Sequence, residues 1–262
     1  MKPIKLFWSR GTGRQRGRRN AGDWFSPRIC EELSGRPVVY APPRRCDMVA
    51  VGSVLHRMTK SHPLHRLGFH RSVHVWGTGS LRESDRLDGS HHVHAIRGQL
   101  TRERIAAAAA DAPLGDPGLL AELLIDPPPV KRHALGLIPH MVDQNDPAVE
   151  RFLERNPHVT RIDITWPVRD VLRTIAACER MLSSSLHGLV FADAFDVPNA
   201  WFTVGDRVLC GRHKFDDYYS AFGLRLEPVH LDRICLENIG TDYARPGIAE
   251  LKLGLAAAFP CS

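Results

Sequence analysis

Strand-like and helix-like patterns alternate regularly through the second half of the chain, and this rhythm constrains the fold more than any other feature. In the segment 146–156, Asp146 is a suitable N-cap, Pro147 takes the first helical position, and Val149 and Phe152 share one face. The predicted strands are 133–140, 159–165, 180–184 and 197–204, and the predicted helices are 146–156, 167–178 and 186–195. This alternation predicts parallel βαβ units with helices covering the sheet.

The first half repeats the rhythm less regularly. The predicted strands are 4–8, 36–41, 46–55, 72–80 and 92–98, and the predicted helices are 26–35, 99–110 and 116–125. Gly35 is a good helix stop, and the alanine-rich segment 99–110 has high helix propensity. Three consecutive prolines make 127–133 the predicted interdomain linker, because they can continue neither a helix nor a central strand. We therefore predict an α/β protein with two Rossmann-like domains, 1–126 and 134–262, that face each other across a cleft.

Size, charge and cysteine usage narrow the class of protein. The 262 residues can bury a substantial core, and the formal charge of +6 favours an anionic partner. Such a partner is a phosphorylated small molecule, a nucleic acid or an acidic lipid surface. The six cysteines lack C-x-x-C spacing, which argues against a disulfide scaffold or a zinc ribbon. No apolar run approaches the roughly 18 residues of a membrane span, so we expect a soluble cytoplasmic protein.

The junction "SSSLHG" (183–188), between a predicted strand and the next helix, concentrates hydrogen-bonding groups. Ligands of parallel sheets bind at the carboxyl ends of strands, where the first turn of the next helix offers free N–H groups to anions. The serine hydroxyls add donors, Gly188 would let a ligand approach the backbone, and His187 would face the cleft. The alternative is structural: one serine is a simple N-cap, and the histidine makes only structural hydrogen bonds.

Several segments resemble, in the right order, those of the polysaccharide pyruvyltransferase family, which attaches pyruvate as a cyclic ketal to bacterial surface sugars. "SSSLHGLVFADAFDVPNAW" resembles a family signature, "NAGDWFSPRI" an N-terminal Asn-x-Gly-Asp element, and "AIRGQLTRERI" an Arg-Gly segment. "LGDPGLL", "LGLIPHMVD" and "KFDDYYSAFG" are also similar, the last two to shorter exopolysaccharide-type members; the resemblance spans roughly residues 20 to 223. It implies a fold similar to GT-B glycosyltransferases and phosphoenolpyruvate as donor, without a further cofactor and without a metal.

The resemblance also implies roles for residues in donor binding and proton transfer. His187 is the expected acid for the donor's methylene carbon, because histidine titrates near neutral pH. Arg97 is the expected clamp, since its planar fork suits phosphate and carboxylate; its alternative is a surface ion pair or a helix-start contact. The other expected donor-binding residues are Ser184, Ser185, Leu186, Gly188 and Lys214. Many relatives carry arginine at the position of Ser185. If that arginine grips the donor, another cation must replace it here, and the candidates are Arg97, Arg102, Arg212 and Lys214.

Three residues at strand ends are candidates for handling the acceptor. Asp23 is the second candidate catalytic residue, as a base or an orienting group for an acceptor hydroxyl, and Asn20 and His140 are candidates for acceptor binding. The alternative for the segment 20–23 is a turn in which Asp23 caps the next helix. The alternative for His140 is a structural role.

The remaining signals leave other functions open. Five arginines in 9–20 favour a solvated loop, or contact with a lipid-diphosphate-linked sugar or with the inner face of the plasma membrane. No aromatic residues interleave with them, so no nucleic-acid partner is expected. The histidines in 91–94 and 62–70 lack completing metal ligands, and "VWGTGS" lacks the third glycine of a dinucleotide fingerprint. The alternative functions are a GT-B glycosyltransferase that uses a sugar nucleotide and a basic nucleic-acid-binding protein.

Overall fold

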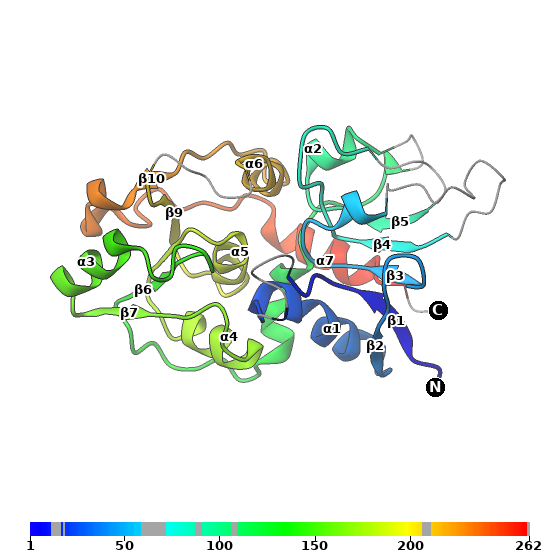
Figure 1. Ribbon diagram of the computed structural model, residues 1–262, viewed down its shortest axis with the longest axis horizontal. Helices are drawn as coiled ribbons and strands as arrows, with labels where there is room; N and C mark the ends of the chain where they lie inside the picture. Colours follow the sequence, from blue (N-terminus) through cyan, green and yellow to red (C-terminus); the bar gives the residue numbers. More distant parts are fainter. Residues whose placement is uncertain are drawn as a thin grey trace.

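Two parallel five-stranded sheets organise the residues that the structure describes (Figure 1). The structure is a computed structural model that describes residues 1–11, 17, 19–58, 72–86, 91–105, 109–205 and 211–260. The first sheet has the order β2-β1-β3-β4-β5. Its strands are β1 (Ile4–Phe7), β2 (Val38–Tyr40), β3 (Met48–Val49), β4 (His74–Trp76) and β5 (His92–Ala95). The strands predicted in the first half are confirmed, although β3 is much shorter than 46–55.

The second sheet has the order β10-β9-β8-β6-β7, and its strands pair in parallel. Its strands are β6 (Leu135–Ile138), β7 (Val159–Arg161), β8 (Met181–Ser183), β9 (Asn199–Thr203) and β10 (Val229–His230). The four strands predicted between 133 and 204 are confirmed, and β10 is an addition that the sequence does not signal. The prediction of an α/β chain with parallel strands is therefore confirmed in both halves.

The two sheets share one topology. Numbered along the chain within each sheet, both have the strand order 2-1-3-4-5. In this order the chain leaves the first strand on one side and later returns to its other side. The loops that follow β1 and β3, and likewise β6 and β8, therefore diverge, and a crevice opens beyond the carboxyl ends of these strands.

The helices begin and end largely where capping residues place them. They are α1 (Ala21–Ser34), α2 (Gln99–Arg102), α3 (Pro147–Arg155), α4 (Val168–Ala176), α5 (Leu186–Ala194), α6 (His213–Ser220) and α7 (Ile248–Ala257), with the 3-10 helices η2 (Leu55–Arg57), η5 (Pro117–Leu124), η6 (Leu231–Arg233) and η7 (Leu236–Asn238). Asp146 caps α3 by accepting a hydrogen bond from the N–H of Ala148, as predicted. Gly35 ends α1 in the left-handed conformation with a φ of 62°, also as predicted.

Two helix predictions were wrong in extent. Helix α1 begins at Ala21 rather than near Ser26, because the side chain of Asn20 accepts a hydrogen bond from the N–H of Gly22 and caps the helix earlier. Helix α2 ends at Arg102 instead of continuing to residue 110, and residues 103 and 104 form a turn. The high helix propensity of the alanine-rich segment therefore does not determine where α2 ends. Residues 106–108 lie outside the described residues.

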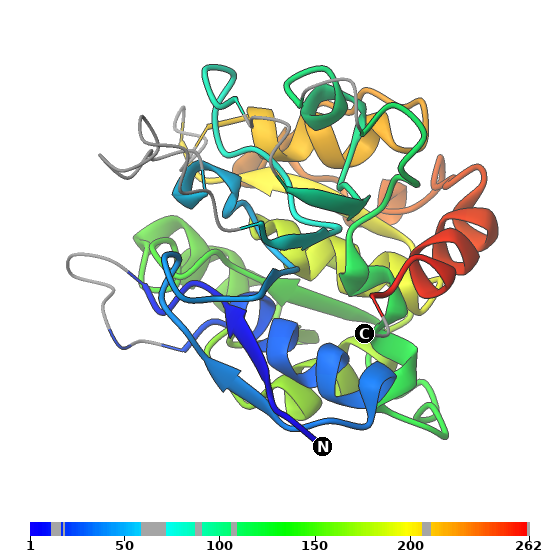
Figure 2. The same cartoon turned by 90° about the vertical axis from the view of Figure 1, so that its right-hand side faces the viewer.

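One hydrophobic core runs through both halves of the molecule. The rings of Phe25 in α1 and Phe191 in α5 lie 5.1 Å apart within it, and η5 packs against both helices. Helix α7 returns to the first half, where Trp76 Nε1 donates a hydrogen bond of 2.9 Å to the carbonyl of Leu255. Figure 2 shows α7, in red, beside the green segment that contains η5. The domain limits 1–126, 127–133 and 134–262 stay a prediction, as does the likeness to GT-B enzymes.

Candidate active site

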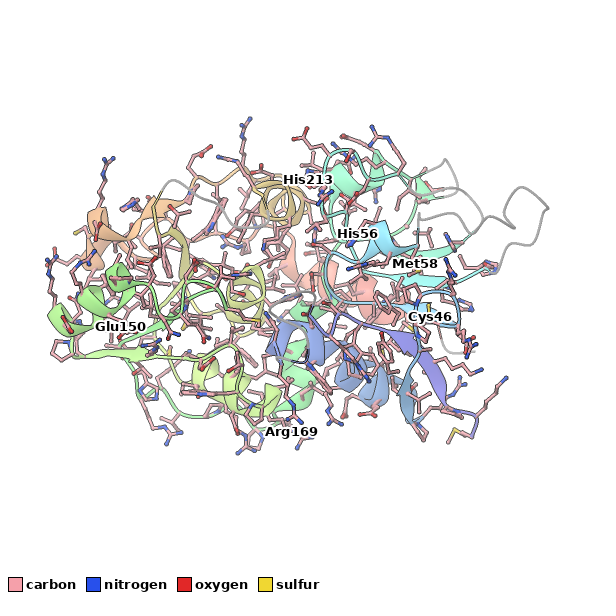
Figure 3. All side chains as sticks on the ribbon, in the orientation of Figure 1. Cys46, His56, Met58, Glu150, Arg169 and His213 are labelled. Atoms are coloured by element: carbon pink, nitrogen blue, oxygen red, sulfur yellow. The ribbon has the colours of Figure 1, made fainter. Side chains whose placement is uncertain are left out.

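The crevices of the two sheets open into one cleft of about 680 Å³. Its lining includes residues that follow the four diverging strands: Ser9 and Arg10 after β1, Gly52 and Ser53 after β3, His140 after β6, and Ser185, Leu186 and His187 after β8. His56 also lines it and is labelled near the middle of the molecule in Figure 3. Open α/β sheets bind ligands at such points, so this cleft is the candidate active site.

Most of the residues predicted for the site meet in this cleft. Its lining contains Asn20, Asp23, His140, Ser185, Leu186, His187 and Lys214. Three other predicted residues, Arg97, Ser184 and Gly188, do not line it. The roles assigned to all of them stay predictions, but their positions now separate residues that can touch a ligand from residues that support the cleft.

His187 lies in the first turn of α5 and is 9% exposed. Its Nε2 lies 3.8 Å from Oδ2 of Asp116, and both atoms are buried without a hydrogen-bond partner. Burial, followed by the charges of Arg97 and Lys214, lowers the pKa of His187 to about 3. Burial raises the pKa of Asp116 to about 6. The surroundings of His187 thus favour a neutral imidazole that faces a carboxyl group just beyond hydrogen-bonding distance.

Asp116 is fixed from its other side. It is the N-cap of η5, where its Oδ1 accepts a hydrogen bond of 2.9 Å from the N–H of Gly118. This bond satisfies one carboxyl oxygen and leaves the second facing His187. The segment "LGDPGLL" is similar to the family, but no local pattern in it indicates that Asp116 meets a histidine so far along the chain.

Asp23 belongs to the first turn of α1 and has an unusual acidity. Burial raises the pKa of Asp23 to about 7, although a hydrogen bond with the side chain of Ser9 and the charge of Lys214 both lower it. A carboxyl group with a pKa near neutrality can both accept and return a proton at physiological pH. On the opposite wall, burial and then Lys214 lower the pKa of His140 to about 4, so this ring is neutral near pH 7.

Lys214 is the cation that links these groups. It lies in the first turn of α6, is 8% exposed and lines the cleft. Its positive charge acts to lower the pKa of all three groups, together with burial at His140 and His187 and against burial at Asp23. Among the four cations considered as replacements for the arginine at the position of Ser185, Lys214 is the one that lines the cleft.

The other three candidate cations lie outside the cleft lining. Arg212 pairs with Asp216 and Glu227, and Arg102 donates hydrogen bonds to Gln99 and to a backbone carbonyl. Neither side chain lines the cleft. The sequence-based hypothesis of a substitute cation is thereby narrowed to Lys214, with Arg97 as a support behind the cleft.

Arg97 lies behind the cleft wall, with its side chain 0% exposed. Its Nε donates to Asp217 Oδ2 at 2.8 Å, its Nη1 to Ser53 Oγ at 2.6 Å, and its Nη2 to the carbonyl of Ser80 at 2.7 Å. A Cβ atom on Gly79 would lie 2.3 Å from Arg97 Cζ, so backbone packs directly against the guanidinium. Arg97 therefore lies behind the cleft wall and holds the cleft residue Ser53, and its role as a clamp on the donor stays a prediction.

The hydroxyl of Ser184 supports the backbone instead of facing the cleft. Its Oγ accepts a hydrogen bond of 2.8 Å from the N–H of His140 and donates one of 2.9 Å to Asp143 Oδ2. Ser184 therefore fixes the loop that carries His140 into the cleft. Direct contact between Ser184 and a donor stays a prediction.

Gly188 has a packing role in the structure, and its predicted role in ligand approach stays a prediction. A Cβ atom at Gly188 would lie 2.2 Å from Ser183 Oγ. The same Oγ accepts a hydrogen bond of 3.0 Å from the N–H of Ser185. Gly188 thus lets α5 pack closely on the end of β8, and among the three serines of this segment Ser185 is the one that lines the cleft.

Several cleft residues are not singled out by the sequence. Arg10, Tyr40, His56 and Arg57 line the cleft, and the guanidinium of Arg10 lies 3.6 Å from the centroid of the Tyr40 ring. Arg10 could have been found, because it directly follows a predicted strand within the basic segment 9–20. Residues 12–16 and 18 of that segment, and the whole of 62–70, lie outside the described residues.

Among the residues that the structure describes, no group of three or more His, Cys, Asp or Glu side chains is arranged to hold a metal ion. In the histidine-rich segment 91–94, His94 Nε2 shares a hydrogen bond of 2.8 Å with Nδ1 of His74. The ring of His92 stacks on the ring of His74 at 5.2 Å. Within the same described ranges, no helix combines the length and apolar character needed to cross a bilayer.

Comparison with known proteins finds relatives of this chain. Residues 129–206 match the family described as "Polysaccharide pyruvyl transferase". The chain is 30% identical over 221 residues to an uncharacterized protein, L143, of Acanthamoeba polyphaga mimivirus, covering 78% of this chain and 71% of that protein. It is 26% identical over 186 residues to the succinoglycan biosynthesis protein ExoV of Rhizobium meliloti (strain 1021), covering 69% of this chain and 55% of that protein. No solved structure matches the chain significantly.

Proposed function

We propose, because this chain belongs to the polysaccharide pyruvyl transferase family, that it transfers the pyruvyl group of phosphoenolpyruvate to a sugar and forms a pyruvate ketal. The proposed acceptor is a sugar of a bacterial exopolysaccharide, free or in a lipid-linked precursor made at the inner face of the plasma membrane. The similarity to a succinoglycan biosynthesis protein supports this class of acceptor.

The charge of the cleft is the observation that supports the proposal most directly. Arg10, Arg57 and Lys214 line it, whereas burial keeps Asp23 partly protonated near neutral pH. Phosphoenolpyruvate carries a phosphate and a carboxylate, and cations in a partly enclosed cleft suit both groups. The start of α5, where Leu186 lines the cleft, adds the N–H groups and the partial positive charge of a helix N-terminus.

The proposed reaction forms two C–O bonds at C2 of the donor. A proton adds to the methylene carbon, which becomes the methyl group, and positive charge develops at C2. Two sugar hydroxyl oxygens attack C2 in turn, while the bond between C2 and the phosphate oxygen breaks. The two hydroxyl protons balance the proton added to the methylene carbon and the proton that leaves on phosphate. No oxidant or reductant is required.

His187 is the proposed acid for the methylene carbon. It lines the cleft, its buried Nε2 faces Asp116, and its Nδ1 lies beside Gly22 of α1, between the cleft residues Asn20 and Asp23. Burial is the main cause of the low pKa of His187, and the charges of Arg97 and Lys214 lower it further; an anionic donor beside Lys214 would offset these charges and raise the pKa, which favours protonation of the ring with the donor in place. Asp116 would then hold the charged ring by closing the 3.8 Å gap, as a positioning residue.

Asp23 is the proposed base for the acceptor. Its pKa of about 7 lets it take a proton from a sugar hydroxyl at neutral pH and release it to solvent or phosphate. His140, neutral at this pH, and Asn20 are the proposed hydrogen-bonding partners of the other acceptor hydroxyls.

The test incubates the protein with phosphoenolpyruvate and a panel of oligosaccharides, and follows phosphate release together with the ketal methyl signal by NMR. His187→Ala should abolish both signals while the protein stays folded, although the cavity left by the buried ring lowers the free energy of unfolding. His158→Ala, at an exposed position, is the matched control and should keep full turnover. Turnover within threefold of the wild type in His187→Ala would remove His187 as the acid. Thermal stabilisation by uridine diphosphate glucose but not by phosphoenolpyruvate would favour the glycosyltransferase alternative.

A further inference from the structure

A second cavity, of about 480 Å³, lies beside the first turn of α1. Asn20 and Asp23 line the cleft, whereas the intervening Ala21 and the following Trp24 line the second cavity. The start of α4 forms another wall of it through Trp166 and Arg169. Figure 3 labels Arg169 at the lower edge of the molecule and His56 of the cleft near its middle, with α1 between them in this view.

The second cavity combines aromatic faces with charged groups of both signs. Trp166 is 40% exposed, and the guanidinium of Arg19 lies 5.3 Å from the ring of Trp24. Arg28 and Glu31, which pair at 3.0 Å, also line the cavity. A sugar ring has an apolar C–H face, which an aromatic ring can cover. Its hydroxyl groups both donate and accept, so arginine and glutamate side chains can satisfy them together. The volume lies within the range of about 300–1,000 Å³ that is typical of ligand pockets.

A row of aromatic rings connects the second cavity with the cleft. The ring of Tyr40, which lines the cleft, lies 5.1 Å from that of Trp8, and the ring of Trp8 lies 5.8 Å from that of Trp24 in the second cavity. The guanidinium of Arg10 lies over all three rings, at 3.6 Å from Tyr40, 5.0 Å from Trp8 and 6.0 Å from Trp24. Arg10 of the cleft and Trp24 of the second cavity thus lie close together, with the Arg10 guanidinium 6.0 Å from the Trp24 ring.

We propose that the second cavity binds the sugar units of the acceptor chain that adjoin the unit undergoing transfer. The oligosaccharide extends from Asp23 in the cleft, past Arg10 and Trp24, to Trp166. This inference rests on the proposed function, which supplies a saccharide with more than one unit. The concave shape of the cavity disfavours a membrane surface as the occupant, because a flat layer of headgroups does not fill a pocket of this volume.

The experiment measures binding by isothermal titration calorimetry, without donor, so that it does not depend on turnover. The probes are hexasaccharides of β-linked glucose, β-linked galactose and β-linked mannuronate, each with its disaccharide. At least one hexasaccharide should bind more tightly than its disaccharide, and Trp166→Ala should weaken that hexasaccharide about tenfold or more. Leu253→Ala, which truncates an apolar side chain that is 71% exposed on α7, is the matched control and should leave binding unchanged.

The outcomes separate this inference from the proposed reaction. Failure of all three hexasaccharides to bind, or a dissociation constant within twofold of the wild type in Trp166→Ala, overturns the inference. Trp166-dependent binding to vesicles of anionic lipid, without binding of sugars, overturns it in favour of a membrane contact. The affinity for phosphoenolpyruvate should be the same in the wild type and in Trp166→Ala. If the hexasaccharide binds through Trp166 but phosphoenolpyruvate does not bind at all, the saccharide site stands and the proposed reaction fails.

Discussion

A Cβ atom on Gly22 would lie 2.1 Å from Nδ1 of His187, so α1 and α5 can approach at this point only because residue 22 is a glycine. Each polar residue and the glycine of the segment 20–23 therefore has its own structural contribution at this point. Asn20 caps α1, Gly22 admits the His187 ring, and Asp23 lines the cleft beside it. The glycine of the Asn-x-Gly-Asp element thus has a steric reason.

Gly22→Ala should displace His187. The free energy of unfolding should fall by about 1–3 kcal/mol through overpacking, although alanine favours the helix more than glycine does. Turnover should fall along with it, and urea unfolding and the transfer assay measure the two effects. Gly223→Ala is the control: its position is open, so only the left-handed φ of 69° costs stability and turnover should persist. A Gly22→Ala protein with native stability and turnover would disprove the close contact.

Asp116→Asn should separate the two roles of Asp116, which are to position the His187 ring and to cap η5. The amide oxygen can still cap η5, so stability should change little, but the carboxylate that faces His187 is lost. Turnover should fall about tenfold to a hundredfold. The alkaline limb of the pH–rate profile should also move to lower pH, because the imidazolium loses its counter-charge. Asp111→Asn, at an exposed position, is the control. An unshifted pH profile in Asp116→Asn would show that Asp116 only caps η5.

Arg97→Met should destabilise the fold in the absence of any donor. It leaves Asp217 buried without its charged partner, and breaking such a pair costs about 3–5 kcal/mol. Arg161→Met is the matched control, because its pair with Glu150, labelled in Figure 3, is partly exposed and should contribute about 1 kcal/mol or less. Urea unfolding gives both values. Wild-type stability of Arg97→Met, combined with lost affinity for phosphoenolpyruvate, would restore Arg97 as a direct clamp.

His187 should make stability depend on pH. Its pKa is about 3 in the fold, against an ordinary value of 6.5, so between these values the unfolded chain binds a proton that the folded chain does not. Stability is therefore lost as the pH falls from about 6.5 toward 3. Between pH 6 and 4 the wild type should lose up to about 1.4 kcal/mol per pH unit more than His187→Gln. Urea unfolding at four pH values measures both slopes, and parallel slopes would contradict the burial of a neutral ring.

The strands and most helices could be predicted because their signals are local. Asp146 followed by Pro147 begins a helix wherever the rest of the chain lies, and Gly35 ends one for the same reason. The extent of α2 could not be predicted from the alanine run. The N–H of Thr101 in α2 donates to Asp217, a residue of α6 far along the chain, so tertiary contacts fix this helix as much as propensity does.

The site could be predicted in part because ligands of parallel sheets bind beyond the carboxyl ends of strands. That rule brings His187 and His140 to the cleft. It does not say which side chains face a ligand and which make contacts within the protein behind the cleft wall. Arg97 turns toward Asp217, and Asp116 turns toward His187, through contacts between segments distant in sequence. Such pairings depend on how α5, α6 and η5 pack, and no short pattern encodes them.

Titration with phosphoenolpyruvate tests the central claim, that the shared cleft of the two sheets binds an anionic donor beside Lys214. The dissociation constant is measured by calorimetry for the wild type, for Lys214→Met, and for Lys2→Met, which removes an exposed charge outside the cleft lining. The account predicts binding by the wild type and by Lys2→Met, and affinity at least about tenfold weaker in Lys214→Met. Equal affinities in all three proteins, or no binding by the wild type, would contradict it.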